Sequence, residues 1–311
     1  MGVNYQEINK FGNRNFEQKW LRTYCDRINM PSVCLGDQFW HSTGSKIFIH
    51  VPCCGPTTLD DGRKTILWDS GALFIKYPVS LDNYGFSSYA YLVSDKNYDL
   101  ETLTPHDRKE MIRALKKVHV EQIAIKDILG VAPVIIADTH KRQDRPFNDS
   151  VLREWMVAIE AAADNPLFEC WAAFVGKQVG AFRIDFTYGG GFYGEILFNV
   201  RELLRYQVMN ALMFISTREV IRRPHIDHVS YGMRSIYGDK PSLNRFKESL
   251  GYKKILLKER IEIAPKLKPL ISHGIAHVSS RVLDKVDFMS QKVQKLNAIL
   301  YMYSRQTGPE I

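Results

Sequence analysis

The alternation of apolar and polar residues is most regular in the second half of the chain. Residues 168–175 and 180–187 alternate around a Gly-Lys-Gln turn at 176–178, which predicts an antiparallel hairpin. The elements expected after this hairpin are, in order, an apolar strand at 194–200, a long apolar helix at 201–222, a strand beginning at His228, a short helix at 242–250 and a strand at 252–263.

A helix, a strand and two further helical segments are expected before this hairpin. Thr104 and Pro105 have the pattern of an N-cap followed by proline at the first helical position, so a basic helix is expected to begin there. A short strand at 120–125 and helical segments at 126–139 and 150–163 follow. The order from residue 120 is therefore β-α-α-β-β-β-α-β-α-β. This order predicts an α/β fold with a mixed central sheet flanked by helices.

The first third of the chain is richer in short β-like runs. Residues 46–51, 64–68 and 88–93 are each expected to form a strand, and turn-rich sequence separates the first two. The aromatic residues of this part favour a β-subdomain core, with a lid over a substrate as the alternative. They are Phe39, Trp40, Tyr77, Tyr84, Tyr89 and Tyr91.

The end of the chain is basic, amphipathic and mostly helical by pattern. Its apolar residues favour docking onto the rest of the chain or a homodimer through this helix, and binding to a membrane surface through its lysines is a further alternative. They are Leu283, Val286, Val293, Leu296, Ile299 and Leu300. The changes of pattern divide the chain into an N-terminal β-rich segment at 1–103, a domain at 104–265 and a C-terminal helical extension at 266–311.

Composition is that of a globular protein. The 311 residues are 45% hydrophobic and 24% charged, which suffices for a large core. No apolar stretch approaches the roughly 20 residues that cross a bilayer, and the polar start lacks a secretory signal. A cytoplasmic location without stable membrane insertion is therefore expected. The five cysteines are scattered and match no zinc spacing, which favours reduced thiols and no metal site.

The formal net charge of +8 favours an anionic partner over a neutral one. A phosphorylated cofactor, a nucleic acid and an anionic membrane all meet this condition. A solvated basic surface is the alternative, because net charge alone does not distinguish among these.

Two segments resemble the GNAT superfamily of N-acyltransferases, and especially its divergent Fem-like branch. They are GEILFNVRELLRYQVMNALMF at 194–214 and YGMRSIYGDKPSLNRFKESLGYKKI at 231–255. The resemblance covers about residues 104–265. It implies an enzyme that moves an acyl group from a thioester, either acyl-CoA or an acyl carrier protein, to an amine of a small molecule or amino acid.

The resemblance also implies where the donor binds. The edge of the strand at 194–200 would pair with pantetheine amides, and the helix start after Phe198, Asn199 and Val200 would hold phosphate. Arg201 and Arg205 would add side-chain contacts, and Lys247 is a further phosphate candidate. Residues 201–209 lack the glycines that the family usually has in this loop. A charged tRNA, as the Fem-like branch would imply, is therefore an alternative donor.

Four residues are candidates for acid–base chemistry under this resemblance. Glu195 and Asp185 are carboxylates in otherwise apolar strands, which predicts either a partner or a catalytic role. The alternative for these carboxylates is a structural ion pair with Arg183 or another basic group. His228 begins the following strand, and Tyr237 lies where the family often supplies an acidic hydroxyl.

A polar cluster before the hairpin is the candidate acceptor wall. It comprises Asp138, Thr139, Arg142, Gln143 and Arg145, and an exposed surface loop is the alternative interpretation. Two other functions stay open beside the thioester-dependent enzyme. One is an aminoacyl-tRNA-dependent, Fem-like aminoacyl or peptidyl transferase. The other is a non-catalytic binding module that keeps the GNAT-like fold.

Overall fold

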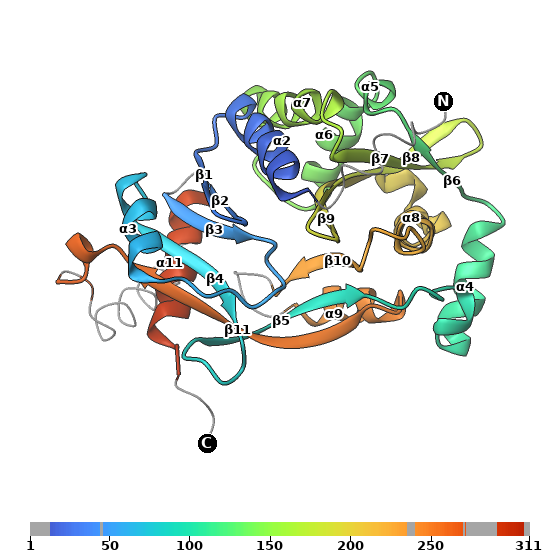
Figure 1. Ribbon diagram of the computed structural model, residues 1–311. Coiled ribbons are helices and arrows are strands. Elements are labelled where there is room, and N and C mark those ends of the chain that lie inside the picture. Colours follow the sequence, from blue (N-terminus) through green and yellow to red (C-terminus); the bar gives the residue numbers. More distant parts are fainter. Residues whose placement is uncertain (1–12, 44–45, 235–239, 270, 272–290, 308–311) are drawn as a thin grey trace. The chain divides into compact units, whose positions relative to one another are not determined.

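The computed structural model describes residues 13–43, 46–234, 240–269, 271 and 291–307 (Figure 1). The backbone forms two compact units, and neither is a continuous segment. Unit 1 consists of Met1–Asn29, Leu92–Tyr231 and Asn244–Lys253. Unit 2 consists of Met30–Tyr91, Gly232–Leu243 and Lys254–Ile311. The three-part division of the sequence at residues 103 and 265 stays a prediction about domains.

Unit 1 has the expected element order up to the short helix before Gly251, with helices added, and the last expected strand lies mostly in unit 2. The elements that lie wholly or mostly in unit 1 are α2 (Arg14–Arg27), η1 (Leu100–Thr102), α4 (Pro105–Leu115), β6 (His119–Ile123), α5 (Ile125–Ile128), α6 (Ala132–Arg142), α7 (Asp149–Ala163), β7 (Phe168–Val175), β8 (Gln178–Tyr188), β9 (Gly191–Asn199), η2 (Arg201–Tyr206), α8 (Val208–Ile221), β10 (His228–Met233) and α9 (Pro241–Ser249). The hairpin at 168–187, the strands that follow it and the capped helix at Thr104 are confirmed. Helix α2 has no counterpart among the sequence expectations.

The sheet of unit 1 has the strand order β10-β9-β8-β7-β6. Strands β6 to β9 pair antiparallel, whereas β10 pairs parallel with β9, so the sheet is mixed. Gly189 and Gly190 turn the chain between β8 and β9 with φ angles of 62° and 78°, which glycine adopts without strain. The predicted fold class, a mixed sheet within an α/β fold, is confirmed.

Helices cover both faces of this sheet (Figure 1). Phe182 and Arg183 are neighbours on β8 and therefore point to opposite faces. The ring of Phe182 lies tilted against the ring of Phe198, which contacts Trp155 of α7, while Arg183 donates a hydrogen bond to Ser216 of α8 at 3.0 Å. Helix α7 thus covers one face and α8 the other.

The helix expected at 201–222 is interrupted, which corrects the sequence interpretation. A 3₁₀ helix, η2, ends at Tyr206, and α8 begins at Val208, so that Gln207 separates the two helices. Gln207 has a left-handed φ of 57°, and its side-chain amide donates to Glu110 of α4 at 3.1 Å. A non-glycine residue in this conformation carries strain, so this contact helps to hold the break.

The strands of unit 2 follow one another in the order β1-β2-β3-β4-β11-β5, with both antiparallel and parallel pairs among them. Its elements are β1 (Ser32–Leu35), β2 (Gln38–Ser42), β3 (Ile47–Val51), α3 (Asp61–Asp69), β4 (Phe74–Val79), β5 (Phe86–Val93), β11 (Lys253–Ile263), η3 (Pro265–Leu267) and α11 (Gln291–Ser304). The N-terminal β-rich segment is confirmed. Of its six candidate aromatics five are buried, and Tyr84 is exposed.

The prediction of a strand at 64–68 is wrong, because this segment lies in helix α3. Asp60 precedes the helix, and its carboxylate accepts a hydrogen bond from the backbone N–H of Arg63 at 2.8 Å. That N-cap satisfies one of the free donors of the first turn. Leu67 is fully buried and anchors the helix. The burial of Leu67 and the N-cap together therefore outweigh the β-propensity of Thr65 and Ile66.

The C-terminal helix α11 packs into the core of unit 2. Ile299 and Leu300 are buried there together with Phe74 and Ile261, which agrees with the docking alternative. Leu283 and Val286 of the expected helix lie outside the described residues. The search of the described part of the chain found no helix long and apolar enough to cross a membrane.

Candidate functional site

Strands β9 and β10 of unit 1 begin as paired neighbours and then lose their register. His228 pairs with Gly191, and the register ends where Ser230 pairs with Tyr193. Strand β9 continues to Asn199. Parallel strands that part in this way leave main-chain groups of β9 open to a ligand.

A β-bulge lies just beyond the end of this register. On the β8 side Asp185 pairs with Gly194 and Ile184 pairs with Ile196, so Glu195 is the extra residue of β9. A bulge leaves its extra residue out of the ladder and re-aims its side chain. Gly194 and Glu195 are the two exposed residues of an otherwise largely buried strand.

A recess of about 110 Å³ opens at the bulge. Its lining comes from β8, β9, β10 and α8 of unit 1. The lining residues are Arg183, Asp185, Gly194, Glu195, Ile196, Leu197, Met213, Ser230 and Tyr231. The recess therefore brings together two of the four predicted acid–base residues, Asp185 and Glu195.

Arg183 and Asp185 form a buried ion pair under the recess. The guanidinium Nε donates to Asp185 Oδ1 at 2.9 Å, and Nη2 contacts the same oxygen. Burial alone would lower the pKa of Arg183, but the adjacent carboxylate raises it above its ordinary value. Arg183 is thus a fixed cation, and the ion pair that the sequence left as an alternative for Asp185 is present.

Only one oxygen of Asp185 is used in this pair. The carboxylate is 0% exposed, and its Oδ2 has no hydrogen-bond partner among the residues that the structure describes. Burial raises the pKa of Asp185 to about 6, although Arg183 acts in the opposite direction. A buried acceptor without a donor is costly, and such groups mark sites where a ligand or water is received.

Glu195 lies in a crowded but solvent-reached position. Its Oε1 accepts a hydrogen bond from the Tyr24 hydroxyl of α2 at 3.2 Å. Burial among protein atoms raises the pKa of Glu195, while the Tyr24 hydrogen bond opposes the rise. Glu195 is nevertheless exposed, because the recess gives water access to it. A carboxylate with these properties suits a general base.

Lys247 of α9 is buried next to the recess wall. Its side chain packs over the ring of Tyr231, with Nζ 4.8 Å from the ring centre, and the residue is 3% exposed. Burial lowers the pKa of Lys247 to about 8. The predicted contact of Lys247 with a donor phosphate would therefore compete with its contact with the Tyr231 ring.

The end of β9 is held by side chains of α6. Thr139 Oγ1 donates to the carbonyl of Asn199 at 2.7 Å and accepts from its N–H at 3.1 Å, and Arg142 donates to the Asn199 side chain at 2.7 Å. Asp138 accepts from the backbone N–H of Arg201 at 2.5 Å. In the structure these three predicted acceptor residues brace the β9–η2 corner.

The remaining donor and acceptor candidates differ in exposure. Arg201, Arg205, Gln143 and Arg145 are exposed, and the Arg205 guanidinium lies 4.9 Å from the ring centre of Tyr206. Phe198 is buried, while Val200 donates its backbone N–H to the Gly180 carbonyl at 2.8 Å. Asn199 lies about 13 Å along β9 from Glu195, at about 3.3 Å per residue.

The other two acid–base candidates are not in the recess lining. His228 lies at the paired start of β10, where its Nε2 is 2.9 Å from the Tyr193 hydroxyl. Tyr237 lies outside the described residues. Both roles stay predictions.

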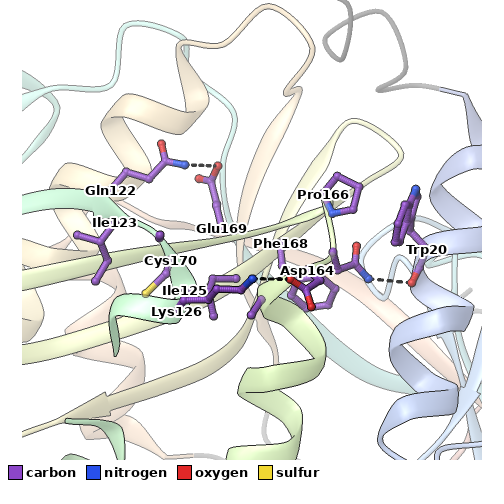
Figure 2. A pocket seen from close by; sticks show the side chains of 13 residues that line it. Trp20, Gln122, Ile123, Ile125, Lys126, Asp164, Pro166, Phe168, Glu169 and Cys170 are labelled. Carbon is purple, nitrogen blue, oxygen red and sulfur yellow. Dashed lines mark hydrogen bonds and ion pairs between the residues drawn. The ribbon is translucent and has the colours of Figure 1, made fainter. Parts of the chain in front are cut away.

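A larger groove of about 610 Å³ lies elsewhere in unit 1, where β6 ends and β7 begins (Figure 2). Figure 2 shows Lys126 pointing to Asp164, with an ion pair of 2.9 Å, and Gln122 pointing to Glu169. Glu169 also pairs with Arg223 at 2.7 Å. The acidic groups of this groove have basic or amide partners, so its volume is the main argument for a site there. The recess is the better candidate, because its carboxyl groups have raised pKa values.

Gly194 and Tyr231 of the recess, and Tyr24 beside Glu195, are among the residues that the sequence reasoning did not assign to the site. Gly194 stands before Glu195, and a glycine inside an apolar strand is a usable signal for a bulge. Tyr24 is 171 residues from Glu195, so no local pattern could connect them. Tyr231 was placed on the strand but was not assigned to the site.

Comparison with known proteins gives a likeness of fold. No protein-family model matches the sequence, and no curated protein matches it. The crystal structure of FemX superposes with a TM-score of 0.59 at 12% identity, over 87% of this chain and 99% of FemX. L-PGS from Bacillus licheniformis superposes with a TM-score of 0.52 at 12% identity, over 96% of this chain and 97% of that one.

A third similar structure is the C-terminal DUF2156 domain of a putative lysylphosphatidylglycerol synthetase from Agrobacterium fabrum. Its TM-score is 0.54 at 10% identity, over 88% of this chain and 96% of that domain. Together these structures confirm the Fem-like resemblance at the level of the fold.

We expect Arg183→Met to destabilise the protein by about 3–5 kcal/mol, because it leaves the Asp185 carboxylate buried without its cation. The loss should be larger at pH 8 than at pH 5, since Asp185 of the variant can take up a proton at the lower pH. Urea unfolding at both pH values measures this. Arg222→Met, which removes an exposed partner of Asp99, is the control and should cost about 0–1 kcal/mol. Equal losses in the two variants would contradict the account.

Proposed function

We propose that this protein is a transferase that moves an acyl or aminoacyl group to an amine in the recess at the β9 bulge. The observation that carries the proposal is the position of Glu195. This carboxylate is the extra residue of the bulge, has a raised pKa and lines the opening where β9 leaves β10. A base at this point can accept the proton of an amine that attacks a carbonyl group held along the β9 edge.

The proposed reaction needs one proton transfer to the protein. The attacking amine gives a proton to Glu195, and its lone pair forms the new C–N bond with the carbonyl carbon of the donor. The bond from that carbon to the donor's oxygen or sulfur breaks, and the leaving group takes a proton from an acid. His228 and Tyr237 stay the candidates for that acid.

The β9–η2 corner favours an aminoacyl-tRNA over acyl-CoA as the donor. An acyl-CoA pyrophosphate would need free backbone N–H groups there, but Asp138 occupies the N–H of Arg201 and adds a negative charge. Arg201 and Arg205 project from η2 and can contact phosphates through their side chains. This agrees with the Fem-like resemblance, and a carrier-protein thioester remains the second donor.

Basic side chains around this corner support an RNA partner. Gln207, which follows η2, donates a hydrogen bond to Glu110 of α4. Three lysines of and just beyond α4 are exposed: Lys109, Lys116 and Lys117. Exposed lysines and arginines and a net charge of +8 suit contact with phosphodiesters.

We expect Arg201→Ala and Arg205→Ala each to weaken tRNA binding and to lower the slope of log K against log salt by about 0.7–0.9. A mobility-shift titration at several salt concentrations measures both quantities. Arg22→Ala, an exposed arginine of α2, is the control and should leave the slope unchanged. Acyl-CoA and acyl carrier protein are titrated in parallel. If a thioester binds and tRNA shows no salt-dependent shift, the tRNA donor is excluded.

We expect Glu195→Gln to lower kcat by about 10²–10⁴-fold with donor affinity unchanged, because it removes the base and keeps the shape. Activity of the unaltered protein should fall as the pH drops through the raised pKa of Glu195, since only the ionised form accepts a proton. Product formation followed by mass spectrometry across pH tests both statements. A Glu195→Gln variant that binds donor and turns over normally would contradict the role of Glu195.

A non-catalytic binding module is the remaining alternative. It would bind a donor and form no product with any amine offered. Single-turnover assays with bound aminoacyl-tRNA or thioester therefore separate this alternative from the enzyme.

A further inference from the structure

Two adjacent cysteines of unit 2, Cys53 and Cys54, hold their thiols side by side. The two Sγ atoms are 3.8 Å apart, and both residues are partly buried free cysteines. In a regular strand, neighbouring side chains point to opposite faces, which would separate these sulfurs. Here β3 ends at Val51, and the chain bends over residues 52–55. The bend therefore turns both thiols to the same side.

Contacts on both sides of the pair hold this bend in place. Before the pair, Nδ1 of the His50 ring lies 2.8 Å from the carbonyl oxygen of Pro52. After the pair, the backbone N–H of Thr57 donates to the carbonyl of Pro78 on β4 at 2.9 Å, and the Thr57 hydroxyl lies 3.2 Å from the same His50 nitrogen. Because the loop is fastened to β3 and β4, the short distance between the thiols is a property of the fold of unit 2.

A buried ion pair acts on the Cys53 thiol. Lys76 of β4 pairs with Glu259 of β11, and the Ser88 hydroxyl of β5 donates to the same carboxylate at 2.7 Å. The hydrogen bond with Cys54 and burial raise the pKa of Cys53 well above its ordinary value, while the Lys76 ammonium acts in the opposite direction. Cys53 therefore keeps its proton while the Cys54 thiol is beside it, which leaves the first reaction to Cys54.

We propose that Cys53 and Cys54 form a reversible oxidation site for a low-molecular-weight disulfide of the glutathione disulfide class. The Cys54 thiolate attacks one sulfur of this oxidant, a mixed disulfide forms, and one half of the oxidant leaves as a thiol. Cys53 then gives up its proton and attacks the Cys54 sulfur, which releases the second half as a thiol. The protein loses two hydrogen atoms and two electrons, and the oxidant disulfide becomes two thiols.

The second step is favoured by the arrangement of the pair. The two sulfurs start 3.8 Å apart, so the attack is intramolecular and well placed. The hydrogen bond that raises the pKa of Cys53 is lost once Cys54 has reacted, so Cys53 ionises more readily at that stage. This oxidation site is independent of the transferase proposed for unit 1.

The product is a disulfide that is easily reduced. The Cα atoms of a disulfide are usually about 4.4–6.8 Å apart, whereas those of adjacent residues are about 3.8 Å apart. Ring closure between neighbours therefore strains the bond, and strained disulfides are the labile ones. The pair can return to two thiols when reduced thiol is in excess.

The test treats the folded, full-length protein with glutathione disulfide and then alkylates the remaining thiols. Mass spectrometry of the peptide that contains both cysteines should show the loss of two hydrogen atoms and no glutathione, and dithiothreitol should restore two alkylatable thiols. Cys53→Ser and Cys54→Ser should each hold glutathione on the remaining cysteine, because no second thiol releases it. Cys34→Ser, which removes an exposed cysteine, is the control and should leave closure unchanged.

Closure in concentrated urea separates the effect of the fold from adjacency in sequence. We expect the mixed disulfide to resolve at least about tenfold more slowly there, because the bend no longer holds the two thiols together. Thiols that both stay unmodified, a mixed disulfide that persists in the folded unaltered protein, or closure that is equally fast in urea would each overturn the proposal.

Discussion

The buried ion pair between Arg183 and Asp185 is the interaction on which the site depends. Both residues lie on β8 and are almost fully buried, so each is stable as a charge only because the other is present. Opposite them β9 takes up the extra residue Glu195, and Gly194 leaves room beside the carboxylate of Asp185. A paired charge on one strand and a bulge on the next together produce a small acidic recess in an apolar sheet.

This arrangement separates two roles that adjacent carboxylates often share. Asp185 is held by Arg183 and has an oxygen left for a ligand, whereas Glu195 is reached by solvent and contacts only the weakly acidic Tyr24 hydroxyl among the hydrogen bonds described for it. Under the proposed function, these environments suit Asp185 for positioning a ligand group and Glu195 for proton transfer. The β9–η2 corner lies farther along the same strand, where Asp138 occupies the backbone N–H that a pyrophosphate would need.

The sequence predicted much of this fold, and the exceptions have physical reasons. The hairpin at 168–187 follows from strict alternation and a turn, which are local signals. Residues 64–68 look β-like by composition, yet the Asp60 cap makes them a helix. The break at Gln207 depends on Glu110, which is 97 residues away, and the Tyr24 contact with Glu195 is equally remote. Glu195 itself could be predicted, because a carboxylate in an apolar strand requires either a partner or a functional role.

The most direct test of the central claim is amide hydrogen exchange of the full chain with and without donor and amine. The account predicts new protection in the peptides that cover 194–197 and 230–231, where the β9 edge and the recess lie. Protection confined to 122–126 and 164–170 would place the ligand in the larger groove of Figure 2 and would contradict the account.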